Sequence, residues 1–211
     1  MLNKITYDNV VKGLIAISLL FMAFGAKAAD FSGSVGVSSD NYFRGVNISD
    51  GAGYSVKGLV DLDNGIFAGA SVMSLDDRTD LMTKAVIGYG RDLGGVKVDV
   101  AYIDYGYQGL SLDGWEEVAV KAYFDKFAVQ YSKGLDNAGD TYIVSSDALE
   151  IVDVAYGDSD MTGSWFEVSK SFDLGGGSLS VGYVDHEAND DDFADMITDI
   201  DNFYVGYSYK F

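Results

Sequence analysis

The stretch that decides the fold is the end of the chain, residues 201–211, DNFYVGYSYKF. Every second residue from Phe203 to Phe211 is aromatic or apolar, and most of the residues between them are small or polar. A period of two predicts a β-strand with one apolar face. Strands of membrane β-barrels have such a face, with aromatic residues gathered at the lipid interfaces, whereas a strand of a soluble β-sandwich is the alternative interpretation.

The same stretch resembles the terminal signal by which outer-membrane barrels are recognised for assembly. The residues of this expected signal are Phe203, Val205, Tyr207, Tyr209 and Phe211. The resemblance implies two partners, the barrel-assembly machinery, which would bind the last strand, and the lipid of the outer membrane.

The beginning of the chain has the features of a secretory signal. Lys4 and Lys12 precede an apolar run at 13–25, which is followed by Ala-Lys-Ala at 26–28. The run is shorter than the roughly 20 residues that a transmembrane helix needs, and the A-x-A triplet is typical of a processing site. We therefore expect residues 1–28 to be a cleaved signal peptide and residues 29–211 to form the exported domain.

The composition narrows the class of protein. The 211 residues include 26 Gly, 15 Tyr and 12 Phe but no Pro and no Cys, and the formal net charge is -19. So acidic a chain lacks the basic face that nucleic acid requires, which excludes nucleic acid as a partner. An exported chain without cysteine has no disulfide framework, so its stability must come from a large core or from closure of a sheet.

Alternating stretches separated by turn residues repeat along the whole exported part. A short turn such as Asp63-Asn64-Gly65 favours a hairpin, and the turns at one end are shorter than the connections at the other. Residues 40–45 keep the alternation of the first strand and place Arg44 on its polar face. Residues 140–156 are ambiguous, and two short strands there give twelve strands in all, with ten as the alternative. The predicted fold is all-β, a transmembrane antiparallel up-and-down β-barrel.

Several segments resemble a known family. Residues 39–51, SDNYFRGVNISDG, and 65–71, GIFAGAS, are similar to the opening of the Gcw_chp family, the TorF-type porins of proteobacteria. Residues 88–89, 94–102 and 105–107 resemble its middle strands. The resemblance implies a pore in the outer membrane of a Gram-negative bacterium and carries over no catalytic residue.

The alternation also predicts which charged side chains face away from lipid. If the barrel encloses water, these side chains line the pore and set its ion preference; alternatively, they pair across a narrow interior and fill it. The candidate pore-lining residues are Arg44, Lys57, Asp61, Lys84, Lys97, Asp99, Glu117, Lys121 and Glu167.

Acidic residues gather near the end of the chain, between 185 and 201. Carboxylates at this density attract cations and are candidates for weak Ca²⁺ or Mg²⁺ binding, although a plain solvated loop is the favoured interpretation. The spacing of an EF-hand loop is missing, so the sequence predicts neither a defined metal site nor a cofactor. The acidic residues are Asp185, Glu187, Asp190, Asp191, Asp192, Asp195, Asp199 and Asp201.

These observations lead to one predicted function and two alternatives. We expect an outer-membrane porin, a passive diffusion channel for small polar solutes or ions, and not an enzyme. A non-conducting surface barrel for adhesion or ligand display is the first alternative. The second is a lipid hydrolase or acyltransferase embedded in the barrel that uses His186, the single histidine, which stands between Asp185 and Glu187 as an exposed loop residue.

Overall fold

The computed structural model describes residues 29–49, 51–75, 80–109, 113–135, 138–147, 151–189 and 199–211. The expected signal peptide, residues 1–28, lies outside the described residues, and so does the middle of the acidic segment, residues 190–198. No helix of the described part is long and apolar enough to cross a membrane.

Twelve antiparallel strands form one closed barrel in which chain neighbours are also spatial neighbours, apart from the closing pair β1 and β14. The all-β, twelve-strand prediction is confirmed, and the ten-strand alternative is wrong because the ambiguous region forms two strands, β10 and β11. The strands are β1 (Ala29–Ser38), β4 (Gly53–Leu62), β5 (Ile66–Ser74), β6 (Leu81–Asp92), β7 (Val96–Gln108), β8 (Trp115–Phe124), β9 (Phe127–Gly134), β10 (Thr141–Ser146), β11 (Asp153–Ser159), β12 (Gly163–Leu174), β13 (Gly177–Glu187) and β14 (Ile200–Lys210).

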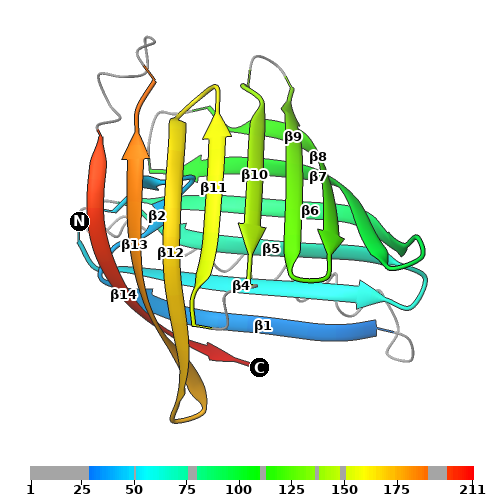
Figure 1. Cartoon of the computed structure of the whole chain (residues 1–211), viewed down its shortest axis with the longest axis horizontal. Coiled ribbons are helices and arrows are strands. Elements are labelled where there is room, and N and C mark those ends of the chain that lie inside the picture. The colour runs from blue at the N-terminus through cyan, green and yellow to red at the C-terminus, as the bar shows by residue number, and fades with distance from the viewer. Residues whose placement is uncertain are drawn as a thin grey trace.

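The strands wrap around an interior with a strong tilt. In Figure 1, β9 to β14 form the near wall, and they cross the strands of the far wall, β1 and β4 to β8, at a steep angle. A closed barrel requires such a tilt, because each strand must shift in register against the next.

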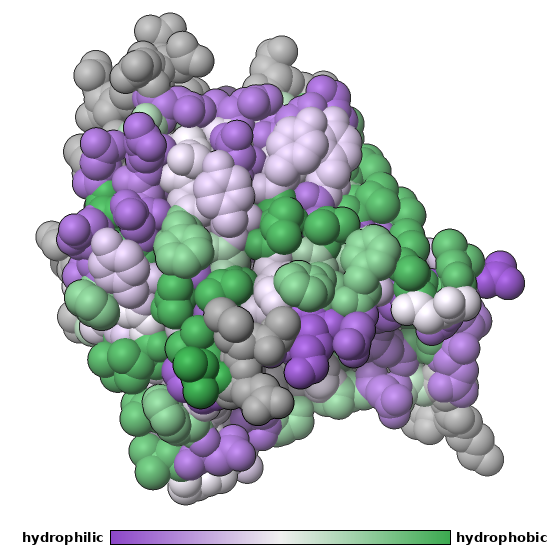
Figure 2. All heavy atoms as spheres, viewed as in Figure 1, coloured by the Kyte–Doolittle hydropathy of each residue, from purple (hydrophilic) through white to green (hydrophobic). Residues whose placement is uncertain are grey.

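The outer face of the barrel is apolar, as the alternation requires. Val35, Val56 and Val72 are cross-strand partners on three neighbouring strands and share this face. Large side chains elsewhere on it are strongly exposed, for example Ile87 at 56% and Phe203 at 71%. Figure 2 shows hydrophobic residues spread across the face made by β9 to β14, with hydrophilic residues gathered along its upper margin. This distribution is typical of a surface that contacts lipid.

Short turns join the strands at one end of the barrel, which we call the turn end. Between β6 and β7, the Asp92 carboxylate accepts hydrogen bonds from the backbone N–H groups of Gly94 and Gly95, at 2.8 and 2.9 Å. Both glycines have positive φ, 81° and 99°, a conformation that other residues adopt only with strain. The local sequence therefore fixes the sharp reversal at this end.

The last strand closes the barrel. β14 pairs with β13 on one side and with β1 on the other, from Ser34 opposite Lys210 to Ser38 opposite Gly206. Gly33 and Phe211 then exchange two backbone hydrogen bonds, 2.8 and 3.0 Å. The alternate residues of the expected assembly signal share the outer face of this strand; that they act as a signal stays a prediction.

One segment departs from the expected path. The alternation predicts that residues 40–45 continue the first strand, but β1 ends at Ser38. The chain then forms a small separate hairpin of β2 (Tyr42–Phe43) and β3 (Val46–Asn47), which is not part of the barrel wall. We call the end of the barrel that holds it the hairpin end.

Candidate functional site: the barrel interior and its hairpin

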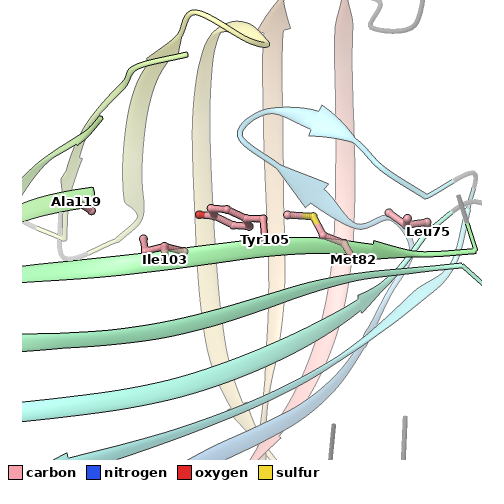
Figure 3. Close-up of a cluster of buried hydrophobic side chains, with 5 residues drawn as sticks. All are labelled: Leu75, Met82, Ile103, Tyr105 and Ala119. Carbon is pink, nitrogen blue, oxygen red and sulfur yellow. The ribbon is translucent and has the colours of Figure 1, made fainter. Parts of the chain in front are cut away.

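The β2–β3 hairpin lies inside the barrel and touches two of its walls. On one side, the Phe43 ring meets the rings of Tyr105 on β7 and Trp115 on β8, with centroids 5.5 and 5.9 Å apart. On the other side, Gly45 lies so close to β12 and β13 that a Cβ atom there would overlap Trp165 and His186. Figure 3 shows the hairpin beside the strands that carry Met82 and Tyr105, whose side chains extend into the interior. The hairpin tip therefore bridges the interior from wall to wall.

A buried ion pair fixes the tip to one wall. One guanidinium nitrogen of Arg44 donates to both carboxylate oxygens of Glu117, each at 2.7 Å, and the Trp115 indole N–H donates to the same carboxylate at 2.8 Å. The side chains of Arg44 and Glu117 are only 5% and 0% exposed. Charges taken out of water need such close partners, so each holds the other in place.

Aromatic rings surround this ion pair and fill the interior on the β7–β8 side. Tyr105 and Trp115 stack with centroids 4.5 Å apart, and Tyr107 lies 5.7 Å from Trp115. The Arg44 guanidinium lies 5.0 Å from the centre of the Phe43 ring and 5.8 Å from that of Tyr105. Ring stacking and cation–π attraction both favour this arrangement.

The base of the hairpin is held by Asn41. Its backbone N–H donates to the Ser49 hydroxyl at 2.7 Å, and its side-chain amide donates to the Ser74 carbonyl at 2.9 Å. The Ser38 hydroxyl donates to the Asn41 side-chain oxygen at 2.8 Å. Asn41, Ser49 and Ser74 are all buried. These bonds join the hairpin to β1 and β5 and direct the chain inward.

The interior contains open space both beside the hairpin and toward the turn end. The larger cavity, about 520 Å³, lies against β1, β4, β5 and β6 and includes Lys57, Lys84 and the hairpin residue Phe43 in its lining. The smaller, about 330 Å³, lies against β8 to β12 toward the turn end and includes Lys121 and Glu167. Charged side chains thus face both open spaces.

The predicted pore-lining residues divide into three groups. Lys57, Lys84, Lys121 and Glu167 line the cavities, as described. Arg44 and Glu117 pair with each other, so neither offers a free charge. Arg44 also differs from its expected place, because it stands at the tip of the hairpin with a positive φ of 51° and not on a wall strand.

The remaining predicted residues lie toward the turn end. The Lys97 ammonium is 3.5 Å from the Asp99 carboxylate, and Asp99 is the cross-strand partner of Lys121. Asp61 is exposed near the end of β4, opposite Asp30. At the other wall, the Tyr204 hydroxyl donates to Glu167 at 2.5 Å, and the Tyr204 ring lies 5.6 Å from that of Tyr42 on the hairpin.

The residues that position the hairpin are not among those predicted from the sequence. Asn41 and Phe43 lie in the segment interpreted as strand, so their inward path was not foreseen. The inward position of Tyr105 and Trp115 could have been predicted from the sequence. They are an even number of residues from Asp99 and Glu117 on the same strands, so they share the inner face. Large rings on the inner face indicate an interior that is packed at that depth.

His186 occupies a different place from the one expected. It belongs to β13, is only 2% exposed, and its Nε2 lies 2.7 Å from the Thr162 carbonyl oxygen. Its neighbours Asp185 and Glu187 fall on the opposite face of the strand because side chains alternate. Neither flanking carboxylate can therefore orient the imidazole as a catalytic triad requires.

The described residues of the acidic segment lie at the ends of β13 and β14 or directly beside them. Asp185 and Asp201 are cross-strand partners, and the Asp199 carboxylate accepts the Ala188 N–H at 3.0 Å. Among the described residues, no three or more His, Asp or Glu side chains form a group able to hold a metal ion.

Known proteins resemble this chain in structure but not in sequence. No family model matches the chain, and no curated protein matches it in sequence. The solved structure of the KdgM porin is similar with a TM-score of 0.57 and 13% identity, covering 85% of this chain and 99% of that one. A second structure, KdgM porin in complex with disordered oligogalacturonate, also has a TM-score of 0.57, with 11% identity, covering 86% of this chain and 99% of that one. Outer membrane phospholipase A from Escherichia coli has a TM-score of 0.46 and 10% identity, covering 83% of this chain and 90% of that one. At these identities the likeness to the two KdgM structures shows a shared β-barrel fold.

Proposed function

We propose that this protein is a passive channel of the outer membrane for small polar solutes or ions, with the β2–β3 hairpin as its constriction. The observation that carries this proposal is the position of Lys57, Lys84, Lys121 and Glu167, which face interior cavities of a barrel whose outer face is apolar. Charged groups inside a barrel are costly unless they are paired or hydrated, so these side chains favour an interior that contains water.

The similar structures support the proposal at the level of the fold. KdgM is described as a porin, and one of its structures holds a disordered oligogalacturonate. A barrel of this fold can therefore serve as a porin. Which solute this chain would pass does not follow from that similarity, because the sequences share little identity.

The cellular context is part of the same proposal. A signal peptide at 1–28 would direct export, and the last strand would be recognised by the assembly machinery and embedded in outer-membrane lipid. The segment 39–51 supports membership of the Gcw_chp family by resemblance. Weak binding of Ca²⁺ or Mg²⁺ by the acidic segment at 185–201 belongs to the proposal as well.

A non-conducting surface barrel is the second candidate. The contacts of Phe43 with one wall and of Gly45 with the other favour it, because a hairpin that spans the interior could block passage. The hydrolase hypothesis has no such support, since the acids beside His186 lie on the other face of its strand.

Single-channel recording separates the two candidates. The full chain is expressed, purified from outer membranes and inserted into a planar lipid bilayer under a salt gradient. A channel gives discrete current steps, and the sign of the reversal potential reports its ion preference. Protein that is folded and inserted but electrically silent would rule out the channel and leave the surface barrel.

A further inference from the structure

The larger cavity contains two lysines that belong to one cross-strand row. Lys57 on β4 is the partner of Ser71 on β5, and Ser71 is the partner of Lys84 on β6. The three side chains share the inner face and line the same cavity of about 520 Å³. Two ammonium groups and a hydroxyl thus face one space from three adjacent strands.

Within the part of the chain that the structure describes, neither lysine forms an ion pair with a carboxylate. Ion pairs of the described residues include Arg44–Glu117, Lys97–Asp99 and Lys133–Asp140, and neither Lys57 nor Lys84 belongs to them. Glu117 is near enough to act electrostatically on Lys84, but it is already bonded to Arg44. The Lys84 ammonium also lies 5.6 Å from the centre of the Tyr105 ring, a cation–π contact that leaves its charge uncompensated by any anion among the described residues. The cavity is therefore locally positive inside a chain whose formal net charge is -19.

Apart from Ser32, Ser34 and Lys210, the rest of the lining is small or apolar. Leu59, Met73, Met82 and Val86 face the cavity from β4, β5 and β6, and Phe43 closes it on the side of the hairpin. Its volume lies within the roughly 300–1,000 Å³ that is typical of small-molecule sites. A small hydrated inorganic anion would satisfy the lysines but would leave this apolar surface unused.

We propose that this cavity binds organic anions that combine a carboxylate with an apolar body, such as aromatic carboxylates. The carboxylate would lie between Lys57 and Lys84, with the Ser71 hydroxyl as a further donor, because charge-assisted hydrogen bonds from ammonium groups to a carboxylate are stronger than neutral ones. The apolar body would contact the methionines and Phe43. The role of this site as a station on a permeation path rests on the proposed function, whereas binding itself does not require conduction.

Calorimetric titration of the detergent-solubilised full chain tests the binding, with benzoate as the probe and benzamide as its neutral counterpart. Heats measured with micelles alone are subtracted. We expect saturable binding of benzoate and at least about tenfold weaker binding of benzamide, since the amide forfeits its attraction to two cations. Equal affinity for the two probes, or no saturable heat with benzoate, would overturn the proposal.

Substitutions locate the site. In Lys57→Gln/Lys84→Gln, benzoate should bind at least about tenfold more weakly, whereas Lys57→Arg/Lys84→Arg should keep most of the affinity because it keeps both charges. Lys133→Gln is the control, because it removes a lysine near the end of β9 that pairs with Asp140 and does not line the cavity. This variant should bind benzoate as the native chain does. Heat-dependent mobility on gels confirms that each variant is folded. Unchanged benzoate affinity in the folded Gln double variant would place the site elsewhere and refute the assignment.

Single-channel recording on the same preparations shows which of the two proposals fails, the channel or the anion site. Binding of benzoate by a folded but silent protein supports the anion site and removes the channel. Current steps that benzoate does not block, from protein that binds no benzoate, support the channel and remove the anion site.

Discussion

The same alternation of residues turns charged side chains inward on both sides of the barrel interior, but one side is packed and the other contains a cavity. On the β7–β8 side, Arg44 and Trp115 both donate hydrogen bonds to the inward-facing Glu117 carboxylate, and aromatic side chains fill the interior around it. On the β4–β6 side, Lys57 and Lys84 face a cavity without a carboxylate partner among the described residues. The alternation of side chains decides that a charge points inward. A carboxylate or guanidinium brought from a distant segment decides whether that charge is neutralised in a packed interior or faces a cavity.

The largest expected effect comes from breaking the ion pair. Arg44→Ala leaves the fully buried Glu117 carboxylate without its cation, and we expect the free energy of unfolding to fall by about 3–5 kcal/mol. Denaturant unfolding in detergent, followed by tryptophan fluorescence, measures this change. The double variant Arg44→Ala/Glu117→Ala is the control and should lose less than the single one. A loss below about 1 kcal/mol in Arg44→Ala, which is what an exposed ion pair contributes, would show that the pair is not buried.

A second expected effect concerns the wall opposite Glu117. Gly45→Ala adds a Cβ that overlaps Trp165 and His186 at a residue with a positive φ of 81°, so we expect a loss of about 2–4 kcal/mol in the free energy of unfolding. Gly51→Ala is the matched control, because Gly51 also has a positive φ, 95°, but has open space around it. It should lose only about 1–2 kcal/mol, from backbone strain alone. Equal losses in the two variants would contradict close contact between the hairpin and this wall.

A smaller effect is expected at the base of the hairpin. Asn41→Ala removes the amide that bonds the Ser74 carbonyl and leaves buried polar groups unpaired, which costs about 1–3 kcal/mol. Asn64→Ala is the comparison, since Asn64 accepts one backbone N–H at an exposed turn. The same unfolding experiment measures both. A larger loss in Asn64→Ala than in Asn41→Ala would argue against the anchoring role.

The smallest expected effect lies at the surface, near the loop between β9 and β10. Hydrogen bonds from Lys133 and Tyr131 hold the pKa of the Asp140 carboxyl below its ordinary value. A lowered pKa means that Asp140 contributes stability at neutral pH, and that this contribution disappears as the pH falls through its pKa in the folded state, below the ordinary value of about 4. Asp140→Asn should therefore unfold slightly earlier than the native chain at pH 7 and together with it in strong acid. A difference that persists in acid would assign the effect to something other than this charge.

The barrel could be predicted from the sequence because its determinants are local. Alternation within each strand, Asn-Gly and Gly-Gly turns, and the apolar face of the last strand specify strands and their faces without knowledge of the partner strands. The count of twelve depended on the interpretation of residues 140–156, which the structure resolves into β10 and β11.

The hairpin could not be predicted because its determinants are distant in the chain. Arg44 and Glu117 are 73 positions apart, and Asn41 and Ser74 are 33 positions apart. Parity continued through residues 40–45 and suggested a strand, although the positive φ values at Arg44 and Gly45 turn the chain back. For His186, the acidic surroundings suggested an exposed loop, whereas the alternation of β13 turns the ring inward and its neighbours outward.

The hairpin as the constriction of a channel is tested most directly by removing it. The Ile48 N–H donates to the Asn41 carbonyl at 2.8 Å, so a Gly-Gly turn can replace residues 42–47 without moving the wall. Unit conductance of the native chain and of this shortened chain is then compared in planar bilayers. We expect discrete steps from both proteins and a clearly larger unit conductance from the shortened one. A shortened chain that is folded and inserted but conducts no better than the native chain, or not at all, would contradict the hairpin's role as the constriction.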